Sequence, residues 1–476
     1  MKATRHLMSR TTMNRRALLR AAGLGGAGAL TLAAGGRGPL GSSLTAAAPA
    51  AQGTTKITFW TPGGSPAFCD VHTQIAKDYA AVEPKVAVDF QCGTDSEAFA
   101  ERLLGSIAAG NPPEATIIWD TPVSFGVRGA LRPLDDLMKS AKYSQVENWP
   151  AAVLKSCQFN GKTYGLPVTA GTYGIWYNQE MFEAKGIPTD RASFPKTWDE
   201  LRKLSKEFTQ WKGDKLVSAG FVLFEPTDLP YTLPVWSALN GGKLYDAANQ
   251  RYSIDAESNT AMMEYFVSWL DEEYQGDINK VKRSGSWRPY PSDEGQPPEF
   301  QAGHLAGVEW GSWGMGDFYA YGDPAFQKWE VAPYPVGPGG KSVVSAYWPN
   351  WLVIPDGTEH PEEAFAYLDF MSGVGVAKWF AAIPDLPTNA RVANVVPEVA
   401  AKKRDEAVAE DATAFFRTQL DVATPMWDSP VQSFAIDQLR GAIERILAKE
   451  SPPSDALAEA QKACQAELEK ALKGAS

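Results

Sequence analysis

The sequence predicts an α/β protein whose first part is built on a parallel β-sheet. Short apolar runs at residues 56–60, 86–90 and 115–119 are typical of strands, and the residues between them have the spacing of helices. The third run is apolar at nearly every position, as expected of a parallel strand covered on both faces. Strand, helix, strand, helix, strand in this order is the signature of an α/β domain.

The two helices between these strands are indicated by their periodicity and their ends. Val71, Ile75, Tyr79 and Val82 recur at spacings of four, four and three, which predicts one buried helical face. The second helix, at residues 99–108, runs into a Gly-Asn-Pro-Pro sequence that closes it, because glycine and proline do not continue a helix.

The middle of the chain continues the same alternation. Residues 171–178 and 216–224 predict further strands, and a helix begins between them at Thr197, whose pairing with Glu200 has the spacing of a capping box. Residues 332–340 are rich in proline and glycine and suit a connection between domains.

The last third of the chain adds one more strand and several helices. Residues 343–354 predict a strand, a helix begins at Pro361, and residues 384–391 form an extended polar segment. Helices are predicted to close the chain.

A segment rich in glycine and tryptophan lies at residues 300–318. Its apolar run at residues 305–308 suits a buried strand, which leads into a turn that holds Trp310 and Trp313. Each indole fills a core or offers a flat surface to a ligand, and for a single tryptophan the core is the more frequent role. The chain holds 16 tryptophans, an excess that is compatible with binding of sugar rings.

Length and composition describe an ordinary globular protein with a targeting segment. The chain has 476 residues, 44% hydrophobic and 21% charged, which predicts two or three structural units. Residues 1–50 carry seven basic residues and a short, weakly apolar stretch, and Arg15-Arg16 resembles a twin-arginine export signal. No cysteine follows at the place of a lipid anchor, so we expect a soluble exported protein, in the periplasm or outside the cell surface.

Charge and cysteine content exclude several classes of function. Without residues 1–50 the chain has 38 basic and 56 acidic residues, a net charge of −18 that disfavours nucleic acid and anionic lipid as partners. Cys69, Cys92, Cys157 and Cys464 show no C-x-x-C spacing, so neither a metal site nor a redox motif is indicated, and no cofactor is expected. Cys69 and Cys92 could form a disulfide, whereas Cys464 is predicted to be a buried free thiol; the connectivity stays open.

Polar groups follow two of the predicted parallel strands, where ligands of α/β sheets bind. The turn of Gly63, Gly64 and Ser65 follows the first strand, and Asp120 follows the third. Glycine backbone and the serine hydroxyl can approach a ligand closely, and a carboxylate accepts hydrogen bonds from hydroxyl groups. Asp120 could equally serve as a helix cap or a turn former.

An ordered set of sequence segments resembles the extracellular solute-binding proteins of ABC transporters, in the family that includes maltose-binding protein. The segments run through nearly all of the chain after residue 50, and they are IIWD with GALRPLDDL, NGKTYGLP, IWYNQEMFEAKGIP with TWDEL, NGG, FQAGHLAG with GSWGMGDF, WLVIPDGTEHPEEAFAYLDFM and LPTNARV.

The resemblance implies two α/β lobes that hold the ligand between them. Residues 54–167 with 335–372 would form lobe one, and residues 173–331 with 376–476 would form lobe two. The chain would cross between lobes near residues 166–171, 333–338 and 371–376.

The same resemblance implies which residues contact the ligand. Gly63, Gly64, Ser65 and Asp120 would do so from lobe one, and Tyr231, Trp313 and Tyr173 from lobe two. Further contacts are implied near Trp310, at Trp348 and at Arg391. Two positions depart from the family: Ser65 replaces charged groups of maltose-binding protein, and Gly171 replaces an acidic residue that some relatives carry before the strand of Tyr173.

We therefore expect a receptor rather than an enzyme. It would act as a monomer, bind a small carbohydrate and pass it to the permease subunits of an ABC transporter. Polar groups for orientation and aromatic faces for sugar rings support this interpretation. The same transport role for a phosphorylated polyol, a polyamine or an oligopeptide is the alternative. A secreted glycan-active enzyme would need two carboxylates flanking a bond, for which Asp120 with Glu309 or Asp317 are candidates.

Overall fold

The computed structural model describes residues 53–64, 66–93, 98–225, 228–287, 298–316, 326, 328–392 and 406–474. The predicted export segment at residues 1–50 and the site candidate Ser65 lie outside the described residues. Within the described ranges, no helix combines the length and the apolar character that crossing a bilayer requires.

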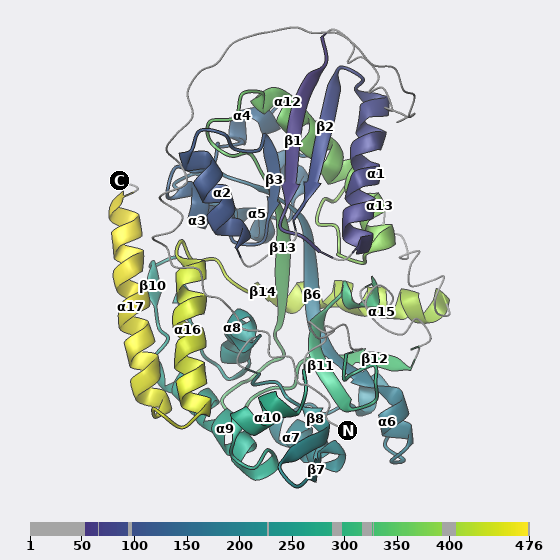
Figure 1. Ribbon diagram of the computed structural model, residues 1–476, viewed down its shortest axis with the longest axis vertical. Helices are drawn as coiled ribbons and strands as arrows, with labels where there is room; N and C mark the ends of the chain where they lie inside the picture. Colours follow the sequence, from purple (N-terminus) through teal and green to yellow (C-terminus); the bar gives the residue numbers. More distant parts are fainter. Residues whose placement is uncertain are drawn as a thin grey trace, which may run out of the picture. The chain divides into compact units, whose positions relative to one another are not determined.

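Strands alternate with helices through most of the chain, as predicted (Figure 1). The strands are β1 Thr55–Thr61, β2 Val86–Cys92, β3 Ala115–Ile118, β4 Gln158–Phe159, β5 Lys162–Thr163, β6 Leu166–Asn178, β7 Gln210–Lys212, β8 Lys215–Phe221, β9 Tyr245–Asp246, β10 Arg251–Tyr252, β11 Leu305–Gly311, β12 Trp329–Ala332, β13 Ser345–Val353 and β14 Ala423–Pro425. The α-helices are α1 Pro66–Val82, α2 Phe99–Ala108, α3 Pro122–Gly126, α4 Asp135–Met138, α5 Ala151–Lys155, α6 Gln179–Glu183, α7 Trp198–Phe208, α8 Leu229–Leu239, α9 Glu257–Glu273, α10 Ile278–Ser284, α12 Pro361–Phe370, α13 Val376–Ala382, α15 Glu406–Gln419, α16 Gln432–Leu447 and α17 Pro453–Gly474.

The large sheet has the strand order β2-β1-β3-β13-β6-β11-β8-β7. Strands β1, β2 and β3 are mutually parallel, which confirms the α/β prediction for this part of the chain. Strand β6 pairs with β13 along its first half and with β11 and β12 along its second half. In Figure 1 the long strands β6 and β13 run between the two groups of elements.

The two groups have separate hydrophobic cores. The first core contains Ile57, Phe59 and Ile117 and packs between the β1–β3 strands and helices α1, α12 and α13. The second core, which contains Trp176 and Phe266, joins β6, β8 and β11 with α7–α9 and the closing helices. We refer to these as the first core and the second core.

Helix α1 buries Ile75 and Tyr79 as predicted, but its inward face begins earlier and does not include Val82. It begins at Pro66, and its inward residues are Phe68, His72, Ile75 and Tyr79, while Val82 is 67% exposed. The pattern beginning at Val71 missed the first turn, where Phe68 and His72 form the aromatic contact with α13.

Two segments predicted to cross between lobes stay with one core instead. Val336 bridges Thr197 and the amide of Gly337 donates to the Leu239 carbonyl at 3.0 Å, so residues 336–337 pack on the second core. The passage to the first core is made by strand β13. The boundary that we placed at residue 335 therefore does not match these contacts.

The boundary predicted near residues 371–376 differs in the same way. A π-helical turn, Met371–Gly375, joins α12 to α13, and the Trp379 indole packs edge-on against Phe68 and His72 of the first core. Helix α13 thus belongs with the first core rather than with lobe two, because its apolar face fits the aromatic side of α1.

The structure shows how the four cysteines are paired. Cys69 at the start of α1 forms a disulfide with Cys92 at the end of β2, and Cys157 and Cys464 are buried free thiols. The pairing therefore ties helix α1 to its neighbouring strand.

Candidate functional site

A cavity of about 930 Å³ lies between elements of both cores. Its volume falls in the range of sites that bind small molecules. Gly64 and Asp120 come from the ends of β1 and β3, Tyr173 and Trp348 from β6 and β13, and Tyr231 from α8.

Gly64 forms the tight turn after β1. Its φ of 146° lies where side chains are disfavoured, and a Cβ there would come within 2.8 Å of the Phe68 ring. Gly63 shares the turn and has a φ of 130°, but it is buried and does not line the cavity. The backbone at Gly64 is therefore the part of this turn that faces the cavity.

Asp120 is held at the wall by a residue from the far end of the chain. The Ser433 hydroxyl on α16 donates to Asp120 Oδ1 at 3.0 Å. Burial raises the pKa of Asp120, and this hydrogen bond opposes the shift. Helix α3 is capped by Thr121, whose side chain accepts from the Val123 amide, so Asp120 is not the cap.

The Trp313 indole packs against the backbone of Gly171 and Gly311. It contacts Tyr173 edge-on with the ring centroids 5.0 Å apart, and a Cβ built at Gly171 would lie 2.5 Å from the indole. Because glycine at residue 171 leaves this space, the ring packs against the β6 backbone and stays half-buried at the cavity wall. The departure from the family at Gly171 thus makes room for the aromatic ring.

Trp310 has a different role from Trp313. Its side chain is 2% exposed and belongs to the second core, although the residue also borders the cavity. The Trp310 carbonyl accepts a hydrogen bond from the Trp176 indole at 3.1 Å. Trp310 therefore supports the wall from behind and offers little ring surface.

Tyr231 and Trp348 form a second aromatic wall. Their rings meet edge-on at 6.1 Å, and Arg440 on α16 donates to the Tyr231 hydroxyl at 3.1 Å. The guanidinium of Arg440 also pairs with Asp437 at 2.9 Å. The hydrogen bond from Arg440 holds Tyr231 in place, and part of the Tyr231 and Trp348 rings faces the cavity.

The structure does not bring Arg391 to the cavity. Its side chain is exposed, and Nη1 donates to the Lys142 carbonyl at 2.9 Å. The extended segment turns away before it reaches this residue, so the polar contact predicted there is absent from the cavity lining.

An earlier part of the same segment supplies the contact that sequence reasoning missed. Asp385 is 5% exposed and lines the cavity, and Asn350 donates to its Oδ2 at 2.6 Å. The Trp119 indole in turn donates to Asn350 Oδ1 at 2.7 Å. The sequence signal for this contact is an acidic residue, Asp385, between Pro384 and Pro387 in the predicted extended segment.

Carboxylates dominate the charge of the cavity. Glu309 accepts hydrogen bonds from Trp236 at 3.0 Å and Tyr334 at 2.5 Å, and burial raises its pKa to about 7. Arg440 is the single basic residue of the described lining. The acidic residues of that lining are Glu101, Asp120, Glu225, Asp228, Glu309, Asp385 and Asp437.

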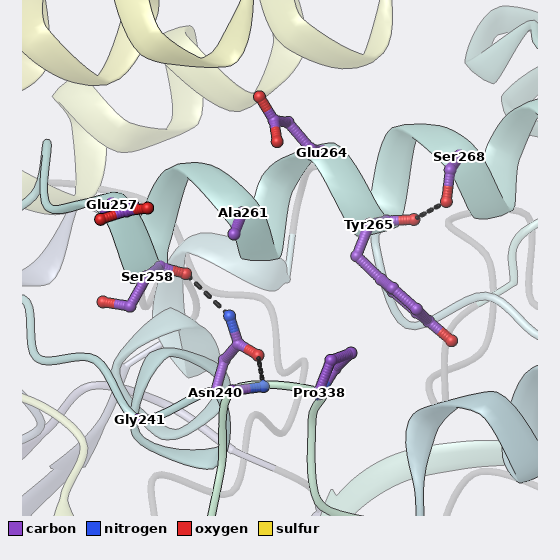
Figure 2. A pocket seen from close by; sticks show the side chains of 10 residues that line it. Asn240, Gly241, Glu257, Ser258, Ala261, Glu264, Tyr265, Ser268 and Pro338 are labelled. Atoms are coloured by element: carbon purple, nitrogen blue, oxygen red, sulfur yellow. Dashed lines mark hydrogen bonds between the residues drawn. The ribbon is translucent and has the colours of Figure 1, made fainter.

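A second and more open hollow, of about 610 Å³, lies beside α9 (Figure 2). Asn240 crosses its edge and donates to the Ser258 carbonyl at 2.8 Å while accepting from the Gly339 amide at 2.9 Å. Tyr265 is its single aromatic residue, and it takes lining from second-core elements alone. It lacks the facing aromatic walls of the larger cavity, which we take as the candidate site.

The fold and the cavity define a two-lobe solute-binding protein, and the chain belongs to the family of bacterial extracellular solute-binding proteins, whose model matches residues 74–410. An uncharacterised ABC transporter extracellular-binding protein of Pyrococcus horikoshii is 24% identical over 366 residues, 73% of this chain and 77% of the relative. The arabinooligosaccharide-binding protein of Bacillus subtilis is 22% identical and covers 68% of this chain and 70% of its own length.

A solved structure shows the same fold. The mannotriose-bound structure of CpMnBP1 superposes with a TM-score of 0.70 at 23% identity, over 86% of this chain and 99% of that one. The two-lobe architecture implied by the resemblance is thereby confirmed.

Proposed function

We propose that this protein binds a sugar outside the cytoplasmic membrane and delivers it to an ABC permease for import. Relatives with this family membership include proteins named for oligosaccharide binding, and the fold is the one seen in a mannotriose complex. The ligand would be a mono- or oligosaccharide held in the 930 Å³ cavity.

The observation that carries this proposal is the combination of ring faces and acceptors in one cavity. Tyr173, Tyr231, Trp313 and Trp348 are each half-buried, so each presents aromatic surface to the cavity. Sugar rings have apolar C–H faces that pack on such surfaces, and their hydroxyl groups donate to carboxylates such as Asp120. An apolar ligand would leave the carboxylates without partners, at a cost in free energy.

The proposed ligand contacts are Gly64, Asp120, Tyr173, Tyr231, Trp313, Trp348, Asn350 and Asp385. Trp310 acts as support behind them, and Arg391 is withdrawn from the set. A division into lobes that runs through β6 and β13 and keeps α13 with the first core, the export signal at residues 1–50 and action as a monomer are part of the proposal.

Closure of the lobes follows from the same arrangement. The cavity takes its lining from elements of both cores, so a ligand that contacts both sides stabilises the closed state over the open one. The closed form would then dock on the permease.

Two of the alternatives, a phosphorylated ligand and a glycan-active enzyme, are less well supported. A phosphorylated ligand requires cationic groups, and the single basic side chain of the described lining, Arg440, is paired with Asp437. Hydrolysis of a glycan requires two available carboxyl groups, whereas Glu309 is engaged by Trp236 and Tyr334; Asp317 lies outside the described residues. We therefore propose a receptor rather than an enzyme.

Isothermal titration of the purified protein with a panel of mono- and disaccharides tests the proposal. We expect saturable binding of at least one sugar. Absence of binding at millimolar sugar, together with tight binding of a solute of another class, would overturn the proposal.

A further inference from the structure

Asp385 is a buried carboxylate with one oxygen that lacks a hydrogen-bond partner among the described residues. Asn350 donates to Oδ2 at 2.6 Å and the Thr169 hydroxyl also interacts with the carboxylate, but Oδ1 itself has no hydrogen-bond partner among the described residues. The side chain is 5% exposed and lines the cavity. A buried acceptor without a donor costs free energy, which a ligand donor in the cavity would recover.

The local surroundings of Asp385 provide no countercharge. Within the described part of the chain its side-chain partners are the uncharged Thr169 and Asn350, with no lysine or arginine among them. Burial raises the pKa of Asp385 to about 7, although Thr169 and Asn350 lower it in part. A cation placed beside the carboxylate would favour its charged form.

The carboxylate lies beside the aromatic ring that we propose as a binding surface. A Cβ built at Gly171 would be 2.5 Å from both Asp385 Oδ1 and the Trp313 indole, so the two groups meet over the same glycine. Indole faces attract cations through their quadrupole. An ammonium group at this point would gain a charge-assisted hydrogen bond and a cation–π contact together.

The charge of the whole cavity points the same way. Seven carboxylates and one guanidinium line its described part, and the guanidinium of Arg440 already pairs with Asp437 and the Tyr231 hydroxyl. A neutral sugar would satisfy hydroxyl acceptors and ring faces, and a cationic ligand would gain in addition from the excess of carboxylates over basic groups.

We propose that the solute of this cavity is an amino sugar or an oligosaccharide of amino sugars, whose protonated amine binds Asp385 Oδ1 beside the Trp313 indole. This inference rests on the proposed sugar-binding function and specifies its substrate class.

The first experiment compares matched sugars by isothermal titration at pH 7.5. Glucosamine, galactosamine, mannosamine and the β-1,4-linked glucosamine disaccharide are each measured against their neutral parent and their N-acetyl derivative. We expect the amine to bind about tenfold tighter or more than both partners, on the scale of one charge-assisted hydrogen bond. The neutral parent is the control for size, because a hydroxyl replaces the amine, and the N-acetyl derivative keeps the nitrogen but removes its charge.

The outcomes distinguish a preference for amino sugars from sugar binding itself. Equal or tighter binding of the neutral parents would overturn the inference and leave sugar binding intact. Binding of spermidine without binding of any saccharide would overturn both.

The second experiment uses Asp385→Asn, which keeps the shape of the side chain and removes its charge. We expect the affinity ratio of amine to neutral parent to fall about tenfold, whatever the affinity of the variant for the parent itself, because the charged acceptor acts on the amine alone. Because the readout is a ratio on the same protein sample, partial misfolding does not mimic it. Asp428→Asn is the control, since Asp428 is a half-buried acid with a pKa raised to about 6 that does not line the cavity. An unchanged ratio in Asp385→Asn would assign the amine to another group and overturn the proposal.

Discussion

Single residues set the surfaces of the cavity, and glycine matters as much as the aromatic residues. Trp313 packs against Gly311 and Gly171, and at either position a Cβ would collide with the indole. The ring therefore keeps its orientation without ligand, which reduces the entropy lost on binding.

Replacing this ring tests its role. Trp313→Ala should weaken sugar binding by ~1–3 kcal/mol, as expected for a buried aromatic contact, while the protein remains folded. Affinity is measured by isothermal titration and folding by circular dichroism. Trp211→Ala is the matched control, because Trp211 is also half-buried but lies away from the cavity and donates to the Glu273 carbonyl. An affinity unchanged by Trp313→Ala would return the residue to a packing role.

Adding one methyl group at Gly171 is a second test at this scale. The Cβ of Gly171→Ala would lie 2.5 Å from Asp385 Oδ1 and from the indole, so one of them must move. We expect a loss of stability of ~1–3 kcal/mol and weaker sugar binding, measured by urea unfolding and titration. Gly105→Ala, on an exposed face of α2 with no atom within 4 Å of the new Cβ, should be neutral or stabilising by up to ~1 kcal/mol. Equal behaviour of the two variants would contradict the steric argument.

At the scale of elements, helix α1 carries a buried histidine into the first core. The His72 ring is fully buried against Phe68 and Trp379, and its Nδ1 lies 2.8 Å from the Phe68 carbonyl. Burial lowers the pKa of His72 from 6.5 to about 4. The imidazole is therefore neutral in the folded protein over a range where it is protonated in the unfolded chain.

This difference makes stability depend on pH. Between pH 6.5 and about 4 the unfolded chain binds the proton and the folded protein does not, so the free energy of unfolding falls as the pH falls. The contribution is fully present above pH 6.5, and about 3 kcal/mol of it is lost by pH 4. His72→Phe should remove this part of the slope, measured by urea unfolding at pH 7.5, 5.5 and 4.5.

Comparison with the wild type isolates the effect of His72. Carboxyl groups with raised pKa values, such as Glu309 and Asp385, act in the opposite direction and are common to both proteins. His304→Gln, at an exposed histidine paired with Glu299, is the control. A wild-type slope in His72→Phe would show that folding does not lower the pKa of His72.

At the scale of the whole molecule, helix α16 of the second core contacts the residues that follow the carboxyl end of strand β3. Gln432 accepts from the Thr121 amide at 3.0 Å, and Ser433 donates to Asp120 at the same distance. These contacts span the two groups of elements around the cavity. A ligand that contacts both groups adds to them and stabilises the closed arrangement.

Sugar binding should therefore make the protein more compact. We expect the radius of gyration measured by small-angle X-ray scattering to fall on saturation with a bound sugar and to stay constant with a non-binding sugar at the same concentration. An identical radius with and without bound ligand would show that closure is not coupled to binding.

The sequence by itself determined the elements and the class of fold. The period of apolar residues predicted β1, β2, β3 and α2 closely, and the capping box at Thr197 and Glu200 is formed as predicted. These features depend on neighbours along the chain, so local patterns suffice to find them. The ordered family segments supplied the two-lobe architecture.

Tertiary structure alone decided which side chains meet at the cavity. Asp385 lies in an extended segment without periodicity, and it reaches the cavity because Asn350 of β13 holds its carboxylate. Arg391, six residues later, turns away to Lys142. Trp310 and Trp313, three residues apart, divide between core and wall because the strand ends between them and the direction of the side chain changes. Contacts between segments hundreds of residues apart depend on packing, which no local pattern encodes.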